Sequence, residues 1–206
     1  GEDKRVVEAA AVSVKEGVAK ITLLGNPEEI KAQNPDVDLS GVTIIDPRTY
    51  HKTEEYANLL YELRKAKGMT EEDATKLIRT NRLYFGNMMM NQGLVDGFVA
   101  GSIASTPDML RSAFHCVGTA KGIKLASSCF IMDLREPTPA GDTTLLYADC
   151  AVNPCPTAEE LVDIALATAT SYKALLGKKP KLAFLSFSSK GSAKHDLVSK
   201  MQQATE

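Results

Sequence analysis

The sequence of 206 residues lacks an excess of charge of either sign, since 24 lysine and arginine residues are balanced by 26 aspartate and glutamate residues. The resulting net charge of -2 does not supply the basic surface that nucleic-acid binding requires. No apolar run is long enough to span a membrane, and the first residues, GEDKRVVEAAAV, are too polar for a signal peptide. We therefore expect a soluble protein.

Cysteine and histidine are both scarce. The 4 cysteines form no C-x-x-C pair, and the 3 histidines do not stand at metal-ligand spacing. Scattered thiols are typical of a reducing compartment, where they fill small apolar spaces, so we expect a cytoplasmic protein without a metal ion. We expect His51, His115 and His195 to be hydrogen-bonded within the fold or exposed to solvent.

Helical and extended segments alternate along the chain. Helical spacing and capping signals predict helices at residues 6–18, 27–30, 54–67, 70–79, 81–90, 107–117, 157–176 and from 193 onward. Short apolar runs predict strands at residues 20–24, 42–45, 97–100, 123–134, 144–152 and 181–187. This order favours a three-layer αβα fold with a mainly parallel sheet.

The expected fold has two subdomains, residues 1–134 and residues 135–206. The strands at 123–134 and 144–152 are joined by a Pro/Gly turn segment, which makes them an antiparallel pair or a crossing between the subdomains. The first helix has no strand before it, and the last has neither a cap nor a following strand. We therefore expect the chain to be a piece of a longer one.

The helix after the third expected strand begins with small hydroxyl residues. Thr106 is the expected N-cap of this helix. Unpaired N–H groups at its start, with the hydroxyls of Ser105 and Thr106, could hold a phosphate or carboxylate, and Arg111 could reach the same anion. An ordinary capped helix with a solvent-exposed arginine is the alternative, and Asp108 would repel an anion if it faced the same way.

A second candidate site follows the last expected strand. The loop of Ser188, Ser189, Lys190, Gly191 and Ser192 precedes a helix, at the place where α/β proteins put ligand contacts. The loop lacks Walker spacing, and a solvated loop without a ligand is the alternative. No G-x-G-x-x-G motif follows a strand, which disfavours a dinucleotide-dependent dehydrogenase.

Three segments resemble one enzyme family. The strings YFGNMMMNQGLVDGFVAGSIASTPDMLRSA, LLYADCAVNP and LAFLSFSSKGSAKHDLV are similar to those of the phosphate acetyltransferase (phosphotransacetylase) family, and the likeness spans almost the whole chain. It implies two α/β domains related to the isocitrate and isopropylmalate dehydrogenase architecture, commonly in a homodimer. It also implies interconversion of acetyl-CoA plus phosphate with acetyl phosphate plus CoA, by direct thiolate attack in a ternary complex. Coenzyme A is then a substrate, and no cofactor is expected.

The resemblance also assigns residues to the substrates. Ser105, Thr106 and Arg111 match the family's S-T-x-D-x-x-R loop and helix, which bind the phosphoryl group. Arg64, within ELRKAKG, matches an arginine implicated in CoA binding; a solvated helix arginine is the alternative. Residues 188–192 match the family's S-[ST]-K-G-S-A-K loop, which faces the cleft.

The chain departs from the family pattern in several places. Ser112 stands where the family has a proline, and Pro107 where it has an alanine. The family's N-D-L-S-R-G segment, with its catalytic serine and arginine and a nearby aspartate base, has no counterpart before Glu206, and the L-P-E strand before GEDKRV is missing. We therefore expect these 206 residues to be inactive, or nearly so, by themselves.

Three other functions remain open. A phosphate butyryltransferase, or the transferase-like domain of a malic enzyme, would share the same motifs. A domain that binds CoA or phosphate without chemistry would lack the same catalytic segment.

Overall fold

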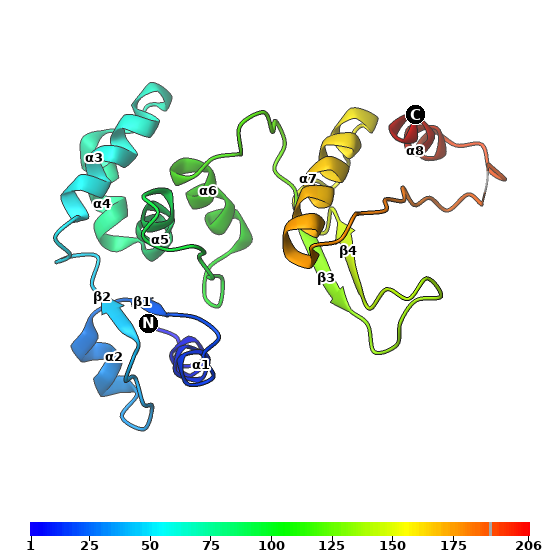
Figure 1. Cartoon of the computed structure of the whole chain (residues 1–206). Coiled ribbons are helices and arrows are strands. Elements are labelled where there is room, and N and C mark those ends of the chain that lie inside the picture. Colours follow the sequence, from blue (N-terminus) through cyan, green and yellow to red (C-terminus); the bar gives the residue numbers. More distant parts are fainter. Residues whose placement is uncertain (190) are drawn as a thin grey trace. The chain divides into compact units, whose positions relative to one another are not determined.

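The computed structural model describes residues 1–189 and 191–206. Two compact units, Gly1–Gly118 and Thr119–Glu206, make up the chain (Figure 1). Each unit is a mixture of helices and short strands. The expected domain division after residue 134 stays a prediction.

Unit 1 begins with a small α/β layer. Its elements are α1 (Lys4–Lys15), β1 (Thr22–Leu24), α2 (Pro27–Gln33) and β2 (Thr43–Ile45). The strands pair in parallel, with Leu23 opposite Ile44. Val7 from α1 and Ile30 from α2 are buried in one cluster with Leu23, because each element turns its apolar face to the same interior. The four elements that the sequence predicts here are confirmed.

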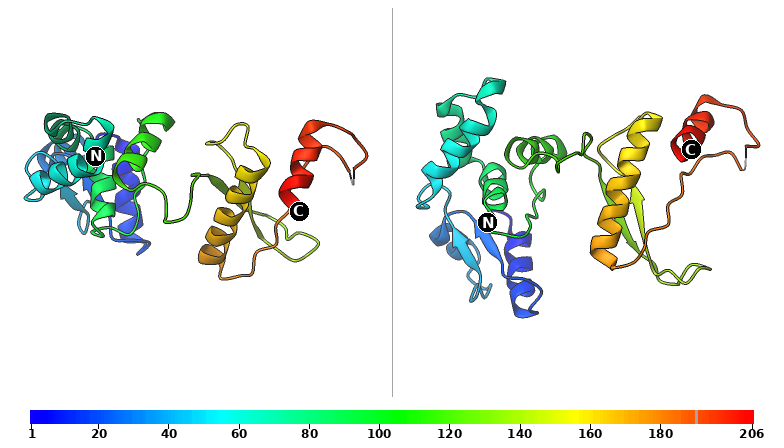
Figure 2. Two further views of the ribbon diagram at one scale, coloured as in Figure 1. Left: turned by 90° about the horizontal axis from the view of Figure 1, so that it is seen from above. Right: turned by 45° about the horizontal axis from the view of Figure 1, so that its top comes forward.

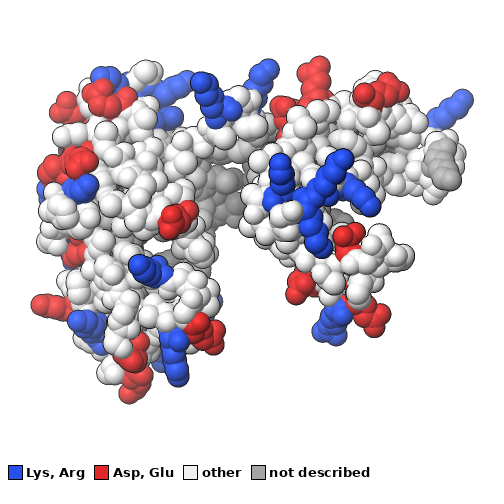
Figure 3. All heavy atoms as spheres, viewed as in Figure 1, with Lys and Arg blue, Asp and Glu red and all other residues white. Residues whose placement is uncertain are grey.

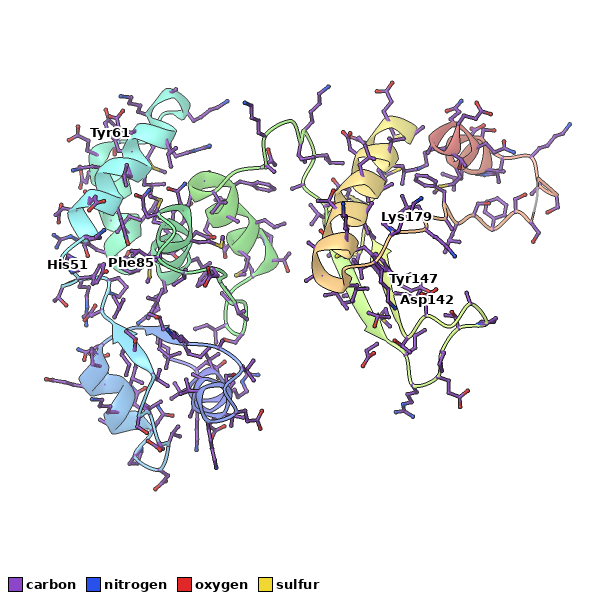
Figure 4. All side chains as sticks on the ribbon, in the orientation of Figure 1. His51, Tyr61, Phe85, Asp142, Tyr147 and Lys179 are labelled. Carbon is purple, nitrogen blue, oxygen red and sulfur yellow. The ribbon has the colours of Figure 1, made fainter. Side chains whose placement is uncertain are left out.

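Four helices and a short 3₁₀ turn form the rest of unit 1. They are α3 (Thr53–Arg64), η1 (Lys65–Lys67), α4 (Glu71–Thr80), α5 (Arg82–Asn91) and α6 (Thr106–Cys116). Thr70 caps α4 through a reciprocal pair of hydrogen bonds with Asp73. Phe85, labelled in Figure 4, lies in the core of this group. Its ring centroid lies 5.3 Å from that of Tyr56.

Helix α5 is enclosed by its neighbours. Its residues 84–89 are all buried, and the predicted core role of the methionines is confirmed for Met88 and Met89. Gly86 gives room to an aromatic ring, because a Cβ at this position would lie 2.5 Å from the ring of Phe98. The chain after α5 therefore packs its aromatic side chain directly against the helix backbone.

Unit 2 contains a hairpin and two helices. Its elements are β3 (Cys129–Asp133), β4 (Thr144–Ala148), α7 (Ala158–Leu176) and α8 (Asp196–Thr205). The strands pair antiparallel, with Ile131 opposite Leu146, so the antiparallel alternative is confirmed. Helix α7 packs against β4 and α8 (Figure 2). Thr157 caps α7 at the expected position.

Two expected strands are wrong. Residues 97–100 and 181–187 are not strands. Phe98 packs against the core of unit 1, but other apolar side chains of these runs are exposed: Val99 is 98% exposed, and Phe187 is 66% exposed. An apolar run becomes a buried strand only where a neighbouring strand pairs with it, and residues 1–189 and 191–206 provide no partner strand for these two runs. The strands of the described residues form two two-stranded sheets, one parallel and one antiparallel, instead of one mainly parallel sheet.

The surface and the thiols bear on the expected environment. On the face shown in Figure 3, acidic and basic side chains are interspersed over unit 1, whereas several basic side chains gather in one patch on unit 2. Among the described residues, no helix combines the length and the apolar character needed to cross a bilayer.

The cysteines differ in burial. Cys116 is buried, and burial raises the pKa of its thiol to about 12. Cys155 is exposed, so the expectation that the thiols fill buried spaces is wrong for this residue, which lies in a loop between two prolines.

Asp149 ties the end of β4 to the segment before β3. Its carboxylate accepts hydrogen bonds from the backbone N–H groups of Ser128 (3.0 Å) and Val152 (2.8 Å) and from the side-chain amide of Asn153 (2.8 Å). Burial opposes the ionisation of Asp149, but these donors outweigh it and hold the pKa of the carboxyl well below its usual range. The charged carboxylate therefore stabilises the hairpin end.

We expect Asp149→Asn to lower the free energy of unfolding by about 2 kcal/mol at pH 7, because the amide turns an N–H group toward N–H donors. A carboxyl group whose pKa is lower in the folded than in the unfolded state stabilises the fold at pH values above the unfolded pKa of about 3.9. This stabilisation is lost as the pH falls below about 3.9 and through the pKa of the folded state. The difference between wild type and variant should therefore shrink from pH 5 downward, as measured by urea unfolding.

Asp133→Asn is the matched control, because Asp133 is exposed at the end of β3 and its carboxylate makes no hydrogen bond with the described residues. An equal loss of stability in both variants would contradict the role of Asp149.

Candidate functional site

The predicted anion site lies at the start of α6. Its N-cap is Ser105 and not Thr106, because Ser105 has extended backbone angles and Thr106 is already helical. The Ser105 hydroxyl accepts a hydrogen bond from the backbone N–H of Asp108 (3.3 Å) and donates one to the Asp108 carboxylate (2.6 Å). The carboxylate of Asp108 therefore lies beside the hydroxyl group that is expected to bind an anion.

Arg111 contacts the same carboxylate. Its Nη1 atom lies 3.1 Å from Oδ1 of Asp108, and the two side chains are 58% and 51% exposed. Ion pairs this exposed contribute only about 0–1 kcal/mol, so Arg111 could exchange Asp108 for a phosphate at small cost. The structure thus brings Ser105 and Arg111 together around an acidic side chain.

Helix α5 holds α6 in place through one polar stripe. The Tyr84 hydroxyl lies 2.9 Å from Nδ1 of His115. Asn87 donates to the Ser112 hydroxyl (3.0 Å), and Asn91 donates to the carbonyl of Cys116 (2.9 Å). Positions 84, 87 and 91 lie on one face of a helix, so a single side of α5 sets the position of the helix that carries Arg111.

A pocket of about 570 Å³ opens beside these helices within unit 1. Its lining includes Arg64 at the end of α3, Lys67 and Lys76, together with Asp73 and His115. The Nε atom of Arg64 is buried and has no hydrogen-bond partner in the described part of the chain. A buried donor left unpaired in this way costs free energy that a bound acceptor would recover.

The charge of the pocket is mainly positive. None of the ion pairs among residues 1–189 and 191–206 involves Arg64, Lys67 or Lys76. Asp73 opposes them, but its carboxylate accepts hydrogen bonds from the hydroxyl and backbone N–H of Thr70. The pocket therefore offers cationic donors to an anionic ligand.

The loop after residue 187 is folded on itself. Ser188 accepts a hydrogen bond at its hydroxyl from the N–H of Ala193 (3.1 Å), and the N–H of Ser192 donates to the carbonyl of Ser189 (3.1 Å). Gly191 has a φ of 80°, a left-handed conformation that glycine adopts without strain. Ligand contacts of these residues stay a prediction.

Two further expectations concern the same region. Lys190 lies outside the described residues. The following helix begins at Asp196 instead of residue 193, because His195 caps it by accepting a hydrogen bond from the N–H of Leu197 (3.1 Å). The described residues contain no cluster of three metal-ligating side chains.

His115 had no site role in the sequence analysis, yet it lines the pocket beside Arg64. The polar residues Tyr84 and Asn87 within the apolar stretch of α5 are the available signal, because buried polar groups require partners on a neighbouring element. The partner residues themselves carry no pattern that identifies them in the sequence.

The comparisons with known proteins agree with this architecture. The whole chain, residues 1–206, matches the family described as phosphate acetyl/butaryl transferase, and the chain belongs to this family. It is 48% identical over 206 residues to the phosphate acetyltransferase of Thermoanaerobacterium thermosaccharolyticum and 46% identical over 204 residues to that of Acetivibrio thermocellus. These alignments include 100% and 99% of this chain, but the chain spans only 62% and 61% of the relatives' length.

A solved structure shows the same fold. EutD phosphotransacetylase from Staphylococcus aureus superposes with a TM-score of 0.85 at 35% sequence identity. The match covers 98% of this chain and 59% of that chain.

We expect Asp108→Asn to tighten the binding of inorganic phosphate about threefold, because the variant removes a negative charge that competes for Arg111. Titration calorimetry at constant ionic strength measures this affinity. Asp36→Asn is the control, since Asp36 is exposed in a turn after α2 and the substitution makes the same change in net charge. Equal affinities in the two variants would contradict an anion site at the start of α6.

Proposed function

We propose that the protein containing this chain transfers an acetyl group between coenzyme A and phosphate. In the direction of acetyl-CoA formation, a general base takes the thiol proton of CoA, and the thiolate attacks the acetyl carbonyl of acetyl phosphate. A C–S bond forms, and the bond between the acetyl carbon and the bridging oxygen breaks. Inorganic phosphate leaves with the electron pair of that bond. Coenzyme A is a substrate in this reaction, and no separate cofactor takes part.

The pocket beside Arg64 is the observation that carries this proposal. Its volume of about 570 Å³ is suitable for part of a nucleotide-sized ligand. The buried, unpaired Nε of Arg64 and the lysines at positions 67 and 76 complement the phosphate groups of CoA. Family membership and 48% identity to a phosphate acetyltransferase support the same substrates.

The second substrate is assigned to the start of α6. Ser105, Thr106 and Arg111 bind the phosphoryl group of acetyl phosphate in this proposal, with Asp108 displaced from Arg111. Catalytic residues are not assigned to this chain, because the serine, arginine and aspartate that the resemblance implies have no counterpart before Glu206.

The whole protein is proposed to be a cytoplasmic homodimer. Its fold is proposed to be a three-layer αβα arrangement related to the isocitrate and isopropylmalate dehydrogenase architecture. The likeness to EutD phosphotransacetylase supports the arrangement.

Three alternatives are tested by activity and binding. Rates with acetyl phosphate and butyryl phosphate separate an acetyltransferase from a butyryltransferase. A malic-enzyme domain would occur within a longer gene product that also oxidises malate. CoA binding without turnover by the full gene product would favour a domain that only binds.

We expect Arg64→Ala to weaken CoA binding at least tenfold, because the loss of charge-assisted hydrogen bonds to a phosphate costs about 1.5–3 kcal/mol. Titration calorimetry on the 206-residue chain measures the dissociation constant. Arg79→Ala is the matched control, because Arg79 lies on α4 of the same unit and pairs with Glu54. Equal weakening by both variants would contradict a specific role for Arg64.

We expect the purified 206-residue chain to show no CoA-dependent turnover of acetyl phosphate. The expected reason is the lack of a residue to take the thiol proton and of donors for the carbonyl oxyanion. The increase in ultraviolet absorbance that accompanies thioester formation measures the rate. A rate well above the uncatalysed reaction that Arg111→Ala abolishes would overturn this expectation.

A further inference from the structure

His115 contacts the buried side chain of Tyr84 and also lines the pocket of unit 1. Its Nδ1 atom lies 2.9 Å from the hydroxyl of Tyr84, which is only 5% exposed. The two rings meet edge to face, with their centroids 5.7 Å apart. Because Nδ1 is engaged by Tyr84, Nε2 is the ring nitrogen left for a ligand in the pocket.

The surroundings of His115 favour the uncharged ring while the pocket holds no anion. Burial, and then the charges of Arg64 and Arg111, lower the pKa of His115. A bound group with two negative charges would reverse the effect of these guanidinium groups. The imidazole is therefore placed where the charge of a ligand decides its protonation.

Several charged or titratable groups take part in this balance. From the elements packed against His115 and around the pocket they are Arg64 (α3), Lys67 (η1), Asp73 and Lys76 (α4), Tyr84 (α5), and Asp108, Arg111 and Cys116 (α6). Burial raises the pKa of the Tyr84 hydroxyl and of the Cys116 thiol, so both are uncharged at neutral pH. Asp73 and Asp108 are engaged with Thr70 and with Ser105 and Arg111.

We propose that His115 is a specificity-determining residue that donates a hydrogen bond from Nε2 to a phosphate monoester of the ligand and takes up a proton when this group binds. The proposal rests on the proposed function, because the ligand is the phosphate-bearing nucleotide end of coenzyme A. In this proposal, His115 is a second residue, besides Arg64, that recognises the phosphate groups of CoA. It gives the site a preference for a dianionic phosphate ester.

The proton balance is simple. In the uncharged ring, Tyr84 donates its hydroxyl proton to Nδ1, which leaves the ring proton on Nε2 facing the ligand. When the phosphate monoester binds, one proton from solvent adds to Nδ1, and this N–H then donates to the oxygen of Tyr84. Nε2 remains a donor in both states, and its hydrogen bond becomes charge-assisted in the second.

The test measures binding of adenosine 3′,5′-bisphosphate to the 206-residue chain between pH 6 and pH 8.5. Wild type is compared with His115→Gln, which keeps a polar side chain beside Tyr84 but does not titrate. The ligand's own phosphate ionisation affects both proteins equally and cancels in the ratio of their affinities. We expect the ratio of the wild-type affinity to the His115→Gln affinity to be about tenfold larger at pH 6 than at pH 8.5.

A second measurement does not depend on any variant. The ring protons of His115 in the wild-type chain, followed by NMR, should titrate at least one pH unit higher with the bisphosphate bound than without it. An affinity ratio that is independent of pH, or an unchanged titration of the ring, would overturn the role of His115.

The outcomes also separate this inference from the proposed function. If the bisphosphate binds and Arg64→Ala weakens it while His115→Gln has no pH-dependent effect, only the role of His115 is wrong. If the bisphosphate shows no saturable binding, both the proposed CoA site and this inference are wrong.

Discussion

Burial of helix α5 is the constraint on which the site in unit 1 depends. A helix enclosed by its neighbours must provide a partner for every polar side chain that it carries, because each unpaired group in the interior costs free energy. Tyr84, Asn87 and Asn91 find these partners on α6. Tyr84 and Asn87 are buried, and the need to satisfy these two polar groups therefore fixes the register of α6, and with it the position of Arg111. Asn91, which is exposed, adds a hydrogen bond at the end of the same face.

The two predicted cationic residues are held in different ways. Arg111 is on the surface and pairs with Asp108, an arrangement that solvent and salt weaken. Arg64 keeps its Nε atom in the interior without a partner in the described part of the chain. A ligand would replace a competing carboxylate at Arg111 but would fill a vacant hydrogen-bond position at Arg64. The energy of binding is therefore expected to come mainly from the pocket.

The sequence predicted the helices of unit 1 well because their apolar spacing and capping residues act within a few positions of one another. Thr70 and Asp73 are an example, since both members of the capping pair lie in one turn. The strand expected at residues 97–100 failed for the opposite reason, because a strand depends on partners that are distant in the sequence.

The candidate site was predicted in the same uneven way. Their place at a helix start predicts Ser105 and Arg111, although the same pattern indicates Thr106 as the cap and the structure has Ser105. Arg64 came from a resemblance, and only the structure shows its buried Nε atom. His115 could not be found, since its role depends on α3 and α5 packing against α6, which no local pattern records.

The hydrogen bond between Asn87 and Ser112 has a consequence for the evolution of the family. Proline, which the family is expected to carry at the position of Ser112, has no side-chain oxygen that could accept from an amide. A protein with proline there would leave the residue corresponding to Asn87 without this acceptor. Substitutions at the two positions are therefore expected to covary among relatives, although 25 residues separate them along the chain.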